Sequence, residues 1–85
     1  MYDRGLTART RMSPVRWTPS RMDQLERAAL EGRRVALTRR GTEYIVVARR
    51  MAAVAGSEAI IGWLPMTGEE LTFRLDEIDA FQVVD

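Results

Sequence analysis

The spacing of apolar residues changes at Arg33, and this change constrains the fold more than any other feature of the sequence. Before it, apolar residues between Met22 and Ala29 recur at the spacing of a helix. After it, apolar and polar residues alternate in short runs, most clearly over residues 71–76. The sequence therefore predicts one short helix followed by β-strands.

The predicted helix has sequence signals at both ends. Thr18 suits the capping position, and Pro19 suits the first helical position, where the N–H that proline lacks would have no partner. Gly32 suits the left-handed conformation that ends many helices. A helix of about three turns is not stable alone, so its apolar stripe must pack on the strands. Residues 1–17 show no period and are expected to form a flexible basic arm.

Five strands are expected, separated by turn residues such as Gly41 and Gly56. Their ranges are 33–40, 44–54, 59–64, 71–76 and 80–84. Closing short antiparallel strands into a small barrel removes exposed edges and makes one core. We therefore predict a mainly β fold over residues 18–85, an N-terminal helix followed by a five-stranded antiparallel small barrel. The expected core consists of Leu25, Ala29, Val35, Leu37, Ile45, Val47, Ile61, Leu71, Phe73, Leu75, Ile78, Phe81 and Val83.

The order of these elements resembles the SH3-like and Sm-like small barrels. Residues 68–78 (GEELTFRLDEI) also resemble the closing strand of WYL domains, and residues 25–35 (LERAALEGRRV) resemble the helix and first strand of that family. The Trp-Tyr-Leu tripeptide itself is absent, and its nearest equivalent is residues 59–63. The resemblance implies an Sm-like barrel that senses nucleic acid or a nucleotide ligand, with Arg74 at a position used for ligand contact.

The composition argues against catalysis. Cysteine and histidine are both absent, which removes thiolate chemistry, the usual general base and the usual zinc ligands. The adjacent carboxylates at 69–70 and 76–77 would point to opposite faces of a strand. We expect no enzymatic activity, no cofactor and no metal site. No apolar run approaches the ~20 residues that span a bilayer, so a cytoplasmic protein without membrane contact is expected.

Charge is distributed unevenly along the chain. All 13 basic residues are arginine; residues 33–50 hold six of them against Glu43, whereas residues 51–85 hold Arg74 against seven acids. Arginines on one hairpin would attract phosphates, and Tyr44 and Trp63 are candidate stacking platforms for bases. The candidate nucleic-acid-binding residues are Arg33, Arg34, Arg39, Arg40, Arg49, Arg50, Arg74, Trp63 and Tyr44.

Two other interpretations remain open at this point. The arginines would be solvated on outward faces and paired with Asp76, Glu77 and Asp79, while the aromatic residues would belong to the core. Alternatively, the domain is a protein-interaction or self-assembly module, with the basic hairpin of one subunit against the acidic C-terminal region of the next. The partners expected are thus a nucleic acid or nucleotide ligand, or a second protein chain.

Overall fold

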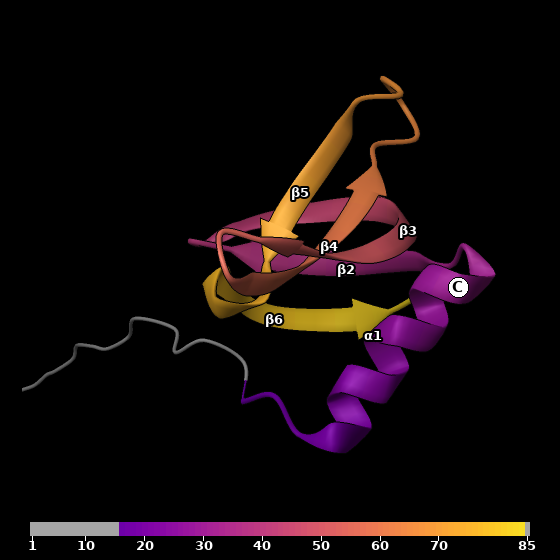
Figure 1. Cartoon of the computed structure of the whole chain (residues 1–85). Coiled ribbons are helices and arrows are strands. Elements are labelled where there is room, and N and C mark those ends of the chain that lie inside the picture. Colours follow the sequence, from indigo (N-terminus) through magenta and orange to yellow (C-terminus); the bar gives the residue numbers. More distant parts are fainter. Residues whose placement is uncertain (1–15, 85) are drawn as a thin grey trace, which may run out of the picture.

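A computed structural model describes residues 16–84, in which five strands follow one helix (Figure 1). This confirms the mainly β fold and the order of its elements. Residues 1–15 of the predicted arm lie outside the described residues. The elements are α1 (Pro19–Glu31), β2 (Arg34–Arg39), β3 (Thr42–Val54), β4 (Ser57–Trp63), β5 (Glu70–Arg74), the 3-10 turn η1 (Leu75–Glu77) and β6 (Ile78–Val83).

The ends of α1 match the predicted signals. The Thr18 side chain accepts a hydrogen bond from the backbone N–H of Arg21 at 3.2 Å. Pro19 is the first helical residue. Gly32 ends the helix in the left-handed conformation, with φ 66° and ψ 35°, and its N–H donates to the carbonyl of Ala28. At each end, local groups thus pair with part of the backbone that the helix itself leaves free.

The strands form one antiparallel sheet in the order β5-β4-β3-β2-β6. Its outer strands, β5 and β6, are joined by η1, and within residues 16–84 no ladder connects them. The sheet is thus not closed, and the predicted small barrel holds only approximately. The three residues of η1 carry the chain directly from one edge strand to the other.

The main core lies between the inner face of this sheet and α1. It contains Leu25, Ala28, Ala29, Val35, Leu37, Val46, Ala48, Ile60, Phe73, Leu75 and Ile78. Most of these residues were expected, but β3 presents the other face to the core. Val46 lies opposite Val35 and is buried, whereas Ile45 is 43% exposed and Val47 is half-buried.

The inward face of β3 differs from the expected one for a simple physical reason. Residues 44–47 are almost entirely apolar, so their composition does not mark which alternate residues face inward. Pairing with β2 decides it, because residues directly opposite in an antiparallel pair share a face. The expected core residues Leu71, Phe81 and Val83 are half-buried at the margin of the core.

Trp17 attaches the chain that precedes α1 to the far end of the sequence. Its ring stacks on that of Phe81, with centroids 5.2 Å apart and planes 15° apart. Its indole N–H donates to the carbonyl of Leu75 at 3.0 Å. Trp17, assigned from the sequence to the basic arm, therefore packs against the folded domain.

Candidate nucleic-acid interface

The six arginines of the β2–β3 hairpin separate into two groups. Arg34 lies opposite Val47, whereas Arg39 lies opposite Thr42 at the other end of the ladder. The five steps from Arg34 to Arg39 span about 17 Å along a strand. Arg33, Arg34, Arg49 and Arg50 thus belong to one end, and Arg39 and Arg40 belong to the hairpin tip. The arginines do not form one continuous stripe.

At the hairpin tip, acidic residues of η1 offset the positive charge. Arg40 pairs with Glu77 at 3.5 Å, and Arg74 pairs with Asp76 at 2.8 Å and with Glu77 at 3.9 Å. The hydrogen bond and the charge of Asp76 raise the pKa of Arg74 above its ordinary value. Two of the three acids that the sequence offered as partners for the arginines, Asp76 and Glu77, thus pair within the domain.

Arg39 and Tyr44 are engaged with the end of the core. The guanidinium carbon of Arg39 lies 4.6 Å from the ring centroid of Phe73 and 5.2 Å from that of Tyr44. Its Nη1 donates to the carbonyl of Thr72 at 3.3 Å. The Tyr44 ring also meets Phe73 edge-on, with centroids 5.2 Å apart. Both side chains therefore contribute to the packing of the domain.

The remaining arginines lie at the other end of the hairpin, where the strand register places Arg34 on the outer face of the sheet. Arg34 lies opposite Val47 on β3, and Val47 lies opposite Trp63 on β4, so the three side chains form a row on the outer face of the sheet. A bulge between Ala48 and Arg50 follows on β3. We call Arg34, Arg49, Arg50, Val47 and Trp63 the outer-face group.

The outer-face group is accessible and positively charged. Arg34, Arg49 and Arg50 are exposed, and Trp63 is half-buried. Within residues 16–84, none of these three arginines forms an ion pair. The bulge adds one residue to β3 there, so two consecutive arginines, Arg49 and Arg50, follow Val47 by two and three residues along this middle strand of the row.

A hollow of about 500 Å³ adjoins the outer-face group. It is lined by Arg34, Ile45, Leu64, Pro65, Met66 and Thr67. Met66 is 97% exposed. Ile45 was expected in the core, so this apolar surface was missed. A signal existed: a strand with four successive apolar residues must place two of them outward.

Arg33 lies apart from the outer-face group. Its Nε is 2.8 Å from Oε1 of Glu31, at the end of α1. Its backbone carbonyl accepts a hydrogen bond from the N–H of Ala48 at 2.8 Å. Of the nine candidate residues, the structure thus brings together Arg34, Arg49, Arg50 and Trp63, and places Arg33 elsewhere.

Neither a metal site nor a membrane span stands out in the part of the chain that the structure describes. Residues 16–84 contain no group of three or more acidic residues arranged to hold a metal ion. Their one α-helix is too short and too polar to cross a bilayer.

The fold of this chain is similar to that of one known protein described below. No family model matches the sequence. No curated protein matches it either. Among solved structures, the chain is similar to Proteasome accessory factor B/C (PafBC) of Arthrobacter aurescens, with a TM-score of 0.64 and 18% sequence identity. The match covers 85% of this chain and 13% of the PafBC chain. At this identity the likeness concerns the fold alone.

Proposed function

We propose that this domain is a non-enzymatic module that binds single-stranded nucleic acid through the outer-face group. Arg34, Arg49 and Arg50 would contact phosphates, and Trp63 would stack on a base. The observation that carries the proposal is the row in which Arg34 and Trp63 both lie opposite Val47. A cationic group and an aromatic ring on one face are the two components of single-strand binding.

The spacing of the strands supports this assignment. Neighbouring strands lie about 4.8 Å apart, so the backbones of Arg34 and Trp63 are separated by roughly 10 Å. Arg50 is three residues beyond Val47 along β3, a further ~10 Å at most. A short stretch of nucleic-acid backbone can therefore reach all of these side chains, with the apolar hollow beside Arg34 available to the bases.

The remaining candidate residues already interact within the domain and are expected to contribute less to binding. Arg40 and Arg74 are paired with acids, and Arg39 and Tyr44 pack on Phe73. The self-assembly alternative also loses support from these pairs. Asp76 and Glu77, two of the seven acids in the C-terminal region that it invokes, already pair within the same chain.

The test is fluorescence anisotropy with labelled single-stranded RNA and DNA at ~50 and ~200 mM salt, a range over which phosphate contacts lose much of their affinity. The variant carries Arg34→Gln, Arg49→Gln and Arg50→Gln. The control carries Arg21→Gln, Arg27→Gln and Arg40→Gln, which removes the same charge from other surfaces. We expect salt-sensitive binding that the first variant loses and the control largely keeps. Equal losses of affinity in the variant and the control would show that binding depends on net charge alone. Absence of binding at low salt would refute the proposal.

A further inference from the structure

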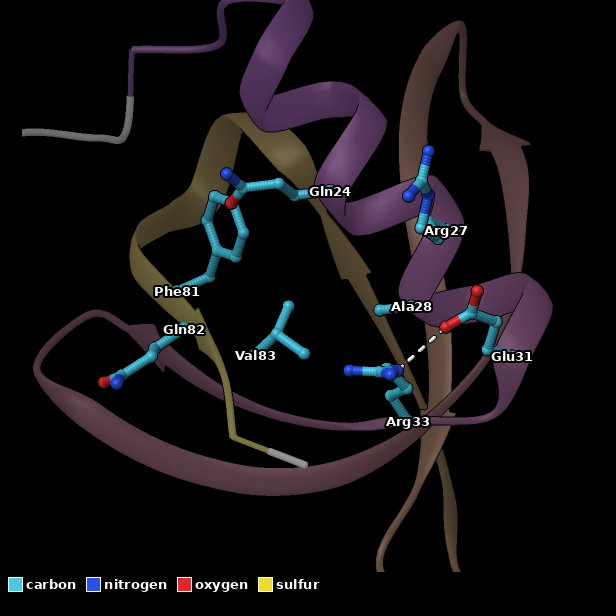
Figure 2. A pocket seen from close by; sticks show the side chains of 8 residues that line it. All are labelled: Gln24, Arg27, Ala28, Glu31, Arg33, Phe81, Gln82 and Val83. Carbon is cyan, nitrogen blue, oxygen red and sulfur yellow. Dashed lines mark ion pairs between the residues drawn. The ribbon is translucent and has the colours of Figure 1, made fainter.

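A second cavity, of about 490 Å³, lies on the other side of the molecule, between α1 and β6 (Figure 2). We call it the α1–β6 cavity. Its lining combines basic, acidic, amide and apolar side chains, among them Gln24, Arg27, Glu31, Arg33, Phe81 and Val83. The volume falls within the range of about 300–1,000 Å³ that is typical of small-molecule sites.

The cationic groups of the cavity retain donors for a ligand. Arg33 uses its Nε to reach Glu31, and its terminal amino groups extend toward the space between Ala28 and Val83 (Figure 2). Arg27 lies 3.6 Å from Asp23 on the helix surface, where both side chains are 68% exposed. An ion pair so exposed is weak, so the Arg27 guanidinium can turn to an anion at little cost.

The floor of the cavity is apolar. Ala28 is buried in the core, while Phe81 and Val83 are half-buried. Trp17 covers one face of the Phe81 ring, and Gln24 of α1 lines the same cavity (Figure 2). A planar hydrophobic group can therefore rest against Phe81 and Val83, with the amide of Gln24 at its edge.

We propose that the α1–β6 cavity binds a small aromatic carboxylate. The guanidinium of Arg33, assisted by Arg27, pairs with the carboxylate, for which the planar fork of arginine is well matched. The aromatic body occupies the apolar floor formed by Phe81 and Val83. This site is separate from the outer-face group, so it adds a small-molecule ligand to the proposed binding of nucleic acid.

The experiment is a titration of the ¹⁵N-labelled protein with 2-naphthoate, followed by backbone and side-chain amide chemical shifts. We expect saturable shifts at Gln24, Ala28 and Val83, and smaller ones at Trp63. The neutral analogue 2-naphthamide should bind at least about tenfold more weakly, because it lacks the charge that Arg33 recognises. The double variant Arg27→Gln with Arg33→Gln should show a similar loss for 2-naphthoate.

The matched control is Arg21→Gln with Arg40→Gln, which also removes two arginines, neither of which lines the cavity. Its affinity for 2-naphthoate should stay within about twofold of the parent. The circular dichroism spectrum of each variant reports whether it folds. Equal affinity for acid and amide, shifts concentrated outside the cavity, or unchanged affinity in a folded double variant would each overturn the proposal.

Discussion

Arg33 and Arg34 are consecutive in the sequence, yet they line two different cavities. Arg33 lines the α1–β6 cavity, whereas Arg34 lines the hollow beside Ile45 and Met66. Alternation of side chains along an extended chain accounts for this, since neighbouring residues point to opposite faces. Two adjacent arginines, one just before β2 and one at its first position, thus supply two separate candidate sites.

The contribution of Trp63 to nucleic-acid binding can be measured by substitution. Trp63→Leu should weaken binding of single-stranded RNA or DNA by about 1–3 kcal/mol, because leucine cannot stack on a base. Trp63→Phe should retain most of the affinity, since it keeps an aromatic face. Anisotropy titrations at fixed salt provide the comparison. Equal affinity of the leucine and phenylalanine variants would show that stacking has no part in binding.

The two arginines of the hairpin tip should differ in their effect on stability. Arg39→Gln removes the contacts with Phe73 and Tyr44 and the hydrogen bond to Thr72, and should lower the free energy of unfolding by about 0.5–1 kcal/mol. Arg40→Gln removes one ion pair of a largely exposed side chain, and should cost about 0–0.5 kcal/mol. Urea unfolding distinguishes them. A larger loss for Arg40→Gln would contradict the assigned packing role of Arg39.

Gly62 permits a close approach of β3 and β4. A Cβ at this position would lie 3.0 Å from Cγ2 of Val46 and 3.0 Å from the carbonyl oxygen of Val47. Gly62→Ala should therefore destabilise the domain by about 1–3 kcal/mol, as overpacking of a core does. Glu58→Ala, at an exposed position of the same strand, is the control. If Gly62→Ala unfolded at the same midpoint temperature as the parent protein, the sheet would adjust freely at this position.

Gly32 is required for its backbone conformation rather than for space. Its φ is 66°, and a Cβ there would meet no atom within 4 Å. Gly32→Ala should cost about 1 kcal/mol in unfolding free energy, because a Cβ is strained in the left-handed region. Gly32→Asn should cost less, since asparagine tolerates that conformation better. If both variants were as stable as the parent, the cap would not hold the end of α1.

Trp17 should behave as part of the folded domain. Trp17→Phe keeps a ring against Phe81 but loses the hydrogen bond to the carbonyl of Leu75, and should cost about 1 kcal/mol. Trp17→Ala also loses the stacked ring and should cost about 2–3 kcal/mol. Chemical denaturation measures both values. An alanine variant with the stability of the parent would place the domain boundary after Trp17.

Local signals in the sequence were sufficient to predict the helix and the strands. The cap at Thr18, the left-handed stop at Gly32 and the alternation over residues 71–76 each act within a few residues, so the helix and the strands were predicted close to their observed bounds. The absence of cysteine and histidine likewise restricts the chemistry without any structure.

Pairing between strands decided which side chains face the core and which arginines lie together. The inward face of β3 depends on the register of Val46 against Val35, and an almost uniformly apolar run carries no information about that register. The grouping of the arginines also depends on which strands lie side by side: Arg34 joins Trp63 through Val47, while Arg74 is held by Asp76 beside Arg40. Such contacts join residues distant in the chain, and only the packing of the sheet as a whole brings them together.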